Sequence, residues 1–377
     1  MKRRDFSRSM ALAAGGALVS SLVPRSARAN DSRREFAANF DTPDAPAAGS
    51  LTDVEGLKVG HWTETRRPTG CTVVIAENGA VAGVDVRGGA PGTRETDLLN
   101  PVNMVQQVYA VMLSGGSAFG LDTATGAMRY LDENNIGYKG MGGPNVPIVP
   151  AAVLFDLGVG DVKIRPNAES GYKACQAAST GPVQEGNVGA GAGATVGKLM
   201  GMQFAMKSGL GSASIRAANT GVVVAAMVAV NAVGDIWDRH TGKVIAGARS
   251  ATPGGDGLAH AMDRLLEGHA MIIPQAGANT TLGVVATNAA LTKDEATKMA
   301  QMAQDGYARA INPAHTPVDG DTIFALSTGT LKEKVWVGAI GALAAVAMSR
   351  AVIRAVTQAT GIPGFPAYAD LQKPTQP

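Results

Sequence analysis

The sequence has few of the residues that build disulfide frameworks and metal sites. Its 377 residues include two cysteines and five histidines, with 5% aromatic and 17% charged residues. Two cysteines are too few for a disulfide scaffold. Cys71 lies in the apolar stretch CTVVIA and is expected to be a buried free thiol, the alternative being a single disulfide with Cys175. The histidines lack the spacing of zinc ligands, so we predict no metal site.

Positive charge is concentrated at the amino terminus. Residues 1–29 contain six basic residues and one acidic residue, so their removal changes the formal net charge from +2 to about −3. No run of Lys and Arg with interleaved aromatic residues occurs in the rest of the chain. Nucleic-acid binding is therefore not expected.

The same 29 residues have the pattern of an export signal. An Arg-Arg pair at residues 3–4 precedes an apolar run at 10–23, and residues 27–29 form an A-x-A cleavage site. This pattern predicts a twin-arginine signal peptide at 1–29, cleaved before Asn30, and a periplasmic or secreted protein that folds before export. The apolar run is shorter than the roughly 20 residues needed to span a bilayer, so no stable membrane anchor is predicted.

Apolar runs and helical patterns mix along the mature chain, which is long enough for one large domain or two. Strands are expected at 72–76, 80–86, 109–115, 221–230, 281–287 and 322–328, and helices at 119–133, 292–311 and 332–360. Thr292 and Glu295 fit a capping box that opens the second helix. The apolar run at 335–348 indicates a helix buried between layers rather than a membrane span. Without a strict βαβ rhythm, these elements predict a layered α/β fold.

Two glycine-rich stretches resemble nucleotide-binding and hydrolase motifs but depart from them. Residues 189–198 look like a phosphate loop, yet Ala192 stands where glycine is required and Leu199 replaces the Ser or Thr that binds Mg²⁺. Residues 115–120 look like a serine-hydrolase elbow, yet Phe119 occupies the second glycine position. Neither nucleotide binding nor a serine elbow is predicted.

The stretch GANTTLGVVATN at 277–288 places two threonines at the head of an apolar strand. A turn that leads into a strand is one interpretation. The other is an N-terminal nucleophile, because the α-amino group of an N-terminal Thr, with a reference pKa of about 7.7–8.0, can act as a base without histidine or metal. This second interpretation requires the chain to be cut between Asn279 and Thr280, after the long Gly/Pro/Ala-containing segment 247–278.

Seven stretches together resemble the self-processing aminopeptidases, which include L-aminopeptidase/D-esterase, the β-aminopeptidases and the nylon-oligomer endohydrolase. They are GAVAGVDVRGGAPGTRETDLLNP (79–101), LSGGSAFGLDTATG (113–126), VPIVPAAVLFDL (146–157), GNVGAGAGATVGK (186–198), VAVNAVGD (228–235), NTTLGVVATNA (279–289) and DGDTIFALSTG (319–329). The resemblance implies a four-layer αββα sandwich and a precursor cleaved into an α chain, 30–279, and a β chain, 280–377.

The resemblance also implies roles for individual residues. Thr280 matches the nucleophile at the head of the β chain, and Asn279 matches the last residue of the α chain. Asp319 and Asp321 match an acidic pair of the nylon-hydrolase branch, where the β-aminopeptidases have Ser and Glu. Acids at i and i+2 of an extended segment point to one side and can hold the ammonium and hydroxyl of Thr280. The alternative for Asp-Gly-Asp is an ordinary turn.

Lys198 and Asn231 match polar residues that line the family's site. The Asn231 amide can donate to the oxyanion of a tetrahedral intermediate, and Lys198 can orient Thr280 or lower the pKa of its ammonium. Without the resemblance, a turn asparagine and a solvated lysine would be expected. Phe155 stands where relatives can carry Tyr, so a hydroxyl is missing there.

The expected function is a self-cleaving amide hydrolase that releases N-terminal residues from short peptides or amino-acid amides, with no cofactor. One alternative is an endo-acting hydrolase of amide oligomers, and another is a binding protein on the same fold that never cleaves. By resemblance, the αβ units are expected to associate into a homo-oligomer, a tetramer.

Overall fold

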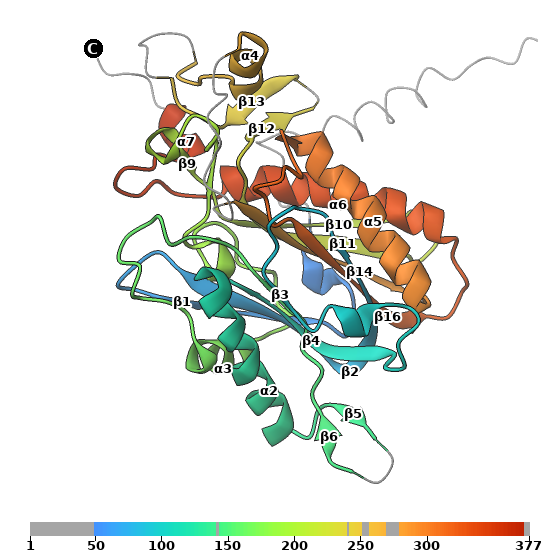
Figure 1. Cartoon of the computed structure of the whole chain (residues 1–377). Coiled ribbons are helices and arrows are strands. Elements are labelled where there is room, and N and C mark those ends of the chain that lie inside the picture. Colours follow the sequence, from blue (N-terminus) through green and yellow to red (C-terminus); the bar gives the residue numbers. More distant parts are fainter. Residues whose placement is uncertain (1–48, 141–142, 240, 251–255, 269–278, 373–377) are drawn as a thin grey trace, which may run out of the picture. The chain divides into compact units, whose positions relative to one another are not determined.

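The predicted strands lie in one large mixed sheet (Figure 1). The computed structural model describes residues 49–140, 143–239, 241–250, 256–268 and 279–372. The predicted signal peptide, 1–29, lies outside the described residues, as do residues 277–278 before the expected cleavage site. The sheet has nine strands in the order β10-β11-β14-β16-β2-β4-β7-β3, with β1 pairing to β2. Their bounds are β1 Lys58–Thr63, β2 Gly70–Val86, β3 Thr93–Arg94, β4 Gln107–Ser114, β7 Ala151–Val153, β10 Leu210–Arg216, β11 Val223–Asn231, β14 Thr280–Ala289 and β16 Thr322–Leu331.

One long strand replaces two of the predicted strands. The runs at 72–76 and 80–86 both belong to β2, because the chain stays extended between them, with an irregular register between Ile75 and Ala80. The first half of β2 pairs with β1 and the second half pairs with β16, while β4 pairs with residues of both halves, as far as Val81. Hydrogen bonding through β2 therefore joins the strands of both β layers into one sheet.

Three apolar cores separate four layers. The outer core lies between helices α5 (Lys293–Ala310) and α6 (Val337–Thr357) and one face of β10, β11, β14 and β16. The inner core lies between these strands and β2, β4 and β7. The third core lies between β2 and β4 and helices α2 (Thr123–Glu133) and α3 (Ala168–Gln176). The order of helix, sheet, sheet and helix confirms the predicted αββα sandwich (Figure 1).

The continuous apolar runs of the central strands follow from this layering. Strand β11 is buried at every position, with Val224 in the outer core and Met227 in the inner core. A strand buried on both faces needs apolar residues at successive positions rather than at alternate ones. Cys71 and Cys175 are both buried in the third core and both free, so the alternative of a disulfide between them is wrong.

The predicted helices are present with shorter limits. Helix α5 begins at Lys293, directly after its N-cap Thr292, and Thr292 and Glu295 form the predicted capping box. Helix α2 begins at Thr123, because residues 117–122 form a 3₁₀ helix, η3. Helix α6 begins only after Trp336, since residues 332–334 are exposed and have no sheet surface to cover.

Helix α6 is long and apolar enough to cross a membrane, the one such helix among the described residues, and 67% of its apolar window is buried inside the protein. It packs on β10 and β11 and against α5 (Figure 1). The burial fits the predicted core helix, although α6 belongs to an outer layer with α5 and does not lie between two layers.

Short elements complete the described fold. They are strands β5 Tyr138–Lys139, β6 Asn145–Val146, β8 Thr195–Val196, β9 Met206–Lys207, β12 Asp235–Asp238, β13 Lys243–Ala246 and β15 Ile311–Asn312, helices α4 Ala261–Leu266 and α7 Tyr368–Leu371, and 3₁₀ helices η1 Leu51–Asp53, η2 Asp97–Leu99, η3 Ser117–Asp122, η4 Gly189–Gly191 and η5 Met202–Phe204. Strands β8 and β9 form a hairpin that carries residues of the candidate site.

Candidate active site

Two predicted site residues face each other at the ends of neighbouring strands. Thr280 is the first residue of β14 and pairs with Asn231, the last residue of β11. Side chains alternate between the faces of a strand, so Thr280 shares the inner face with Leu282, and Asn231 shares it with Ala229. Thr281 lies on the opposite face, toward the outer core. The two threonines therefore have different surroundings, and only Thr280 shares a face with Asn231.

The peptide bond between Asn279 and Thr280 is buried and polarised. Asn279 forms a parallel bridge with Asp319, and the Gly320 N–H donates to the Asn279 carbonyl oxygen over 2.9 Å. The Thr280 hydroxyl donates to the same oxygen over 2.5 Å. A Cβ atom at position 320 would lie 2.6 Å from Thr280 Oγ1, so glycine permits this close approach. A hydroxyl and a hydrogen-bond donor thus meet at one carbonyl group.

The two acids hold the chain around Thr280 rather than its hydroxyl. Asp321 Oδ1 accepts from the Thr281 N–H over 2.8 Å. Asp319 Oδ2 accepts from the N–H and hydroxyl of Thr316, over 2.9 Å and 2.5 Å. In the intact chain the Thr280 hydroxyl donates to the Asn279 carbonyl oxygen instead. The prediction that both carboxylates hold the ammonium and hydroxyl of Thr280 concerns the cleaved chain and stays a prediction. Burial, together with the nearby charge of Asp321, raises the pKa of Asp319 to about 6.

Lys198 and Asn231 form a buried polar pair beside Thr280. Lys198 Nζ donates to Asn231 Oδ1 over 2.8 Å and to the Asn231 carbonyl oxygen over 3.1 Å. The Thr195 N–H also donates to Asn231 Oδ1, over 3.1 Å. Burial lowers the pKa of Lys198 to about 7, and the charges of Asp319 and Asp156 oppose that effect. The alternatives of a solvated lysine and a turn asparagine are therefore wrong for these residues.

Residues 189–198, with their phosphate-loop appearance, carry Lys198 to this position. The loop is tied to the chain that follows β11, because the N–H groups of Gly197 and Lys198 donate to the carbonyl oxygens of Gly234 and Val233 over 3.0 Å and 2.9 Å. These bonds place Lys198 next to the end of β11, where its side chain contacts Asn231. The glycines of this loop have a structural role, and no phosphate site is needed to explain them.

Two contributors to the site were not expected from the sequence. His315 Nδ1 lies 2.9 Å from Asp321 Oδ2, which also accepts from the His315 N–H over 3.1 Å. The spacing of the histidines gives no sign of this contact, but the position of His315 six residues before Asp321 is a usable signal. Phe155 contributes its carbonyl oxygen, which accepts from Asn231 Nδ2 over 3.1 Å. Every residue type has a main-chain carbonyl group, so this contact cannot be predicted from the identity of the residue.

Within the described ranges, no group of three or more His, Cys, Asp or Glu side chains is placed to hold a metal ion. The site residues that these ranges contain are a hydroxyl, two carboxylates, an ammonium, an amide and a main-chain N–H. This set suits acyl transfer by a hydroxyl nucleophile, with donors that stabilise a developing oxyanion.

Known proteins are similar in sequence to this chain over most of its length. The profile of Peptidase family S58 matches residues 49–368. An uncharacterized aminopeptidase of Mycobacterium leprae (strain TN) is 42% identical over 361 residues, which cover 87% of this chain and 95% of that protein. A 6-aminohexanoate-oligomer endohydrolase of Kocuria sp. (strain KY2) is 31% identical over 335 residues, 84% of this chain and 90% of that protein.

Solved structures share the fold. A β-aminopeptidase of Burkholderia sp. superposes with a TM-score of 0.62 at 22% identity and covers 86% of this chain and 93% of its own. The L-aminopeptidase D-Ala-esterase/amidase of Ochrobactrum anthropi, described as a variant of the Ntn hydrolase fold, has a TM-score of 0.62 at 19% identity, with 87% and 93% covered. Together with the sequence match over residues 49–368, the conclusion is that the chain belongs to peptidase family S58 and is a hydrolase of that family.

Proposed function

We propose that this protein is a self-cleaving aminopeptidase or amidase that uses Thr280 as the N-terminal nucleophile of its β chain. The contact that carries the proposal is the one between the Thr280 hydroxyl and the Asn279 carbonyl group, whose oxygen also accepts from the Gly320 N–H. The aminopeptidase name of the 42% identical relative supports release of N-terminal residues from short peptides or amino-acid amides.

Self-cleavage begins with attack of Thr280 Oγ1 on the carbonyl carbon of Asn279. The Gly320 N–H already points at the oxygen that becomes negatively charged, so it stabilises the tetrahedral intermediate without rearrangement. The C–N bond breaks, the proton of the hydroxyl passes to the departing nitrogen, and an ester links the two residues. Water then hydrolyses the ester, which leaves a carboxylate on Asn279 and a free hydroxyl and amine on Thr280. The products are the α chain 30–279 and the β chain 280–377.

Turnover uses the same hydroxyl a second time. The new α-amino group of Thr280 accepts the hydroxyl proton while Oγ1 attacks the substrate carbonyl, and it passes this proton to the amine product as the C–N bond breaks and an ester forms on Oγ1. Water then hydrolyses the ester, which releases the carboxylate product and restores the hydroxyl. The Gly320 N–H, released from the Asn279 carbonyl, is then available to the substrate oxyanion. Lys198 and Asn231 supply positive charge and an ordered amide beside the reacting group. Asp321 holds the strand that begins at the nucleophile through the Thr281 N–H, and Asp319 holds Thr316.

A second candidate is endo-action on amide oligomers. The 31% identical relative from Kocuria sp. is named an oligomer endohydrolase, and the Asp319 and Asp321 pair resembles that branch. The 42% identical aminopeptidase favours exo-action instead.

We also propose that residues 1–29 direct export to the periplasm and that αβ units associate into a tetramer.

The purified protein is expected to consist of two fragments on a denaturing gel, with the smaller one starting at Thr280. The processed protein is expected to hydrolyse members of a panel of L-, D- and β-aminoacyl amides. Amide oligomers in the same panel distinguish cleavage at the chain end from cleavage within the chain. Mass spectrometry of the fragments locates the self-cleavage site, and mass spectrometry of the reaction products shows which substrates are hydrolysed and at which bond. A single intact chain that hydrolyses none of the panel would instead support a binding protein on this fold.

Activity is expected to fall as the pH drops below about 6, because Asp319 then becomes protonated and loses the negative charge that interacts with Lys198. The carboxylate is ionised above that pH, so the Asp319→Asn variant should resemble the protonated wild type. We expect a loss of about 10²-fold in turnover at pH 8 and no acidic limb near pH 6 in the remaining activity. Initial rates between pH 5 and 9 test this; an unchanged acidic limb in the variant would assign it to another group.

A further inference from the structure

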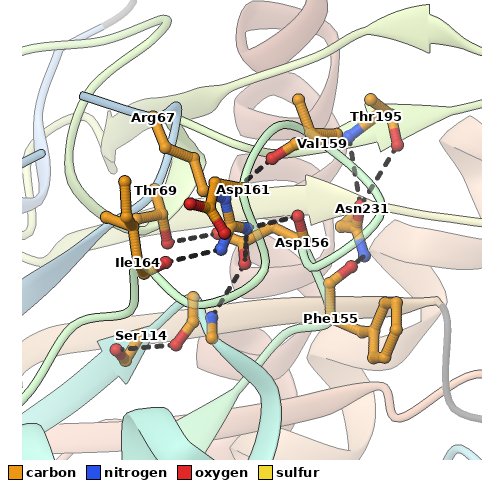
Figure 2. A network of polar contacts seen from close by, with 12 residues as sticks. Arg67, Thr69, Ser114, Phe155, Asp156, Val159, Asp161, Ile164, Thr195 and Asn231 are labelled. Carbon is orange, nitrogen blue, oxygen red and sulfur yellow. Dashed lines mark hydrogen bonds and ion pairs between the residues drawn. The ribbon is translucent and has the colours of Figure 1, made fainter. Parts of the chain in front are cut away.

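A buried ion pair lies behind the candidate site. Arg67 Nη2 and Asp156 Oδ1 are 2.6 Å apart, and both side chains are 0% exposed (Figure 2). Removing two charges from water costs several kcal/mol per ion, and a buried pair often stabilises a protein no more than apolar residues of the same size would. The pair therefore calls for an explanation other than stability.

Arg67 holds the loop that follows β7. Its Nε donates to the Val159 carbonyl oxygen over 2.7 Å, and its Nη1 donates to the Ile164 carbonyl oxygen over 2.7 Å. Its Nη2 donates to the carbonyl oxygen of Asp156 as well as to the carboxylate (Figure 2). One rigid guanidinium group thus fixes three carbonyl groups of residues 156–164.

The Asp156 carboxylate also accepts hydrogen bonds from two other segments of the chain. Its Oδ1 accepts from the Gly116 N–H over 2.9 Å, and its Oδ2 accepts from the Thr69 hydroxyl over 2.5 Å. A Cβ atom would lie 2.2 Å from Asp156 Oδ2 at Gly115 and 2.7 Å from it at Gly193. The two glycine-rich stretches that resemble a serine elbow and a phosphate loop therefore both make room for this carboxylate.

One main-chain carbonyl group connects the Arg67 and Asp156 pair to the candidate site. Phe155 directly precedes Asp156, and its carbonyl oxygen accepts from Asn231 Nδ2 over 3.1 Å (Figure 2). An amide has one accepting atom and one donating atom, so the end that meets a carbonyl must be Nδ2. The other end, Oδ1, then faces the donors Lys198 Nζ and Thr195 N–H. The position of the Phe155 carbonyl therefore selects the orientation of the Asn231 amide.

We propose that Arg67 and Asp156 are positioning residues for catalysis, which hold the Phe155 carbonyl where it orients Asn231 toward Lys198. This inference rests on the proposed function, because it assigns Asn231 and Lys198 to the reacting centre. It predicts that disturbing the pair slows self-cleavage and lowers kcat, since a displacement near 1 Å can cost about 10²-fold in rate, and that it leaves KM nearly unchanged.

The test compares three variants of the full-length protein. Thr69→Val is close to isosteric and removes one hydrogen bond to Asp156, and we expect it to lower kcat about tenfold. Asp156→Asn removes the charge and should lower kcat about 10²-fold in the fraction that folds. Glu185→Gln is the matched control, because Glu185 pairs with Arg354 and accepts from the Ser212 N–H outside the site. It should lower the unfolding temperature without changing kcat.

The measurements are the rate of precursor cleavage, kcat and KM per mole of mature β chain, and the unfolding temperature. A lower unfolding temperature for Thr69→Val with kcat and cleavage rate equal to wild type would overturn the positioning role and leave the pair structural. A wild-type chain that stays intact and inactive would overturn the proposed function, and this inference with it. A fall in kcat for Thr69→Val at constant KM, absent in Glu185→Gln, is the result expected.

Discussion

The Thr280→Ala variant is expected to accumulate as a soluble, intact chain with no measurable hydrolase activity. Alanine removes the hydroxyl that lies on the Asn279 carbonyl group, so neither the ester nor the free α-amino group can form. Both self-cleavage and turnover should fall by at least about 10⁴-fold, the scale seen when a nucleophile is removed from a hydrolase. Thr280 lies at the end of β14 with its backbone paired to Asn231, so the fold should persist. Gel analysis and a substrate assay measure both effects.

Thr281→Ala provides the matched control. Thr281 is buried on the opposite face of β14, and its hydroxyl has no hydrogen-bond partner among the described residues, so its loss should cost little. Its N–H, which donates to Asp321, remains in the variant. This variant should mature and hydrolyse substrate, and N-terminal sequencing of the small fragment of wild type should read Thr-Thr-Leu-Gly. Complete processing of Thr280→Ala, or a fragment that starts elsewhere, would assign the nucleophile to another residue.

Lys198→Met is expected to slow self-cleavage and turnover by about 10²- to 10³-fold, the range for the loss of one group that stabilises an oxyanion. Methionine fills the space of the side chain but leaves Asn231 Oδ1 without its closest donor and removes the charge near Asp319. Because burial lowers the pKa of Lys198 to about 7, the ammonium is present below that pH and is lost above it. The ratio of wild-type to variant rate should therefore be largest below pH 7 and decline as the pH rises.

A second buried lysine offers the control for Lys198. Lys207 Nζ donates to the carbonyl oxygens of Gly191 and Ala194 over 3.2 Å each, and burial lowers the pKa of Lys207 to about 7 as well. Lys207→Met should lower the unfolding temperature because it removes the buried hydrogen bonds that the ammonium donates to these carbonyl groups. Its rate ratio to wild type should not change with pH near 7. A pH-dependent ratio in Lys207→Met and a flat one in Lys198→Met would reverse the assignment.

The layered fold was predictable because its signals are local. Strands β11 and β14 are apolar at successive positions, and this pattern reports burial on both faces without knowledge of the neighbours. The capping box of Thr292 and Glu295 likewise involves residues three apart. The limits of elements were less accurate, because the start of α6 and the continuity of β2 depend on which surfaces the segments cover.

Residue types and the family resemblance predicted Thr280, Asn231, Lys198 and the two acids as site residues, but their contacts follow from the path of the chain. Asp156 and Arg67 are 89 positions apart, and Phe155 and Asn231 are 76 apart, so no local pattern relates them. The role of the Phe155 carbonyl is that of a main-chain atom, which every residue type possesses. The sequence alone thus determined which chemical groups the protein has and the order of its strands along the chain. Only the folded chain decided which groups meet, because side-chain orientation depends on strand register and on partners that are distant in sequence.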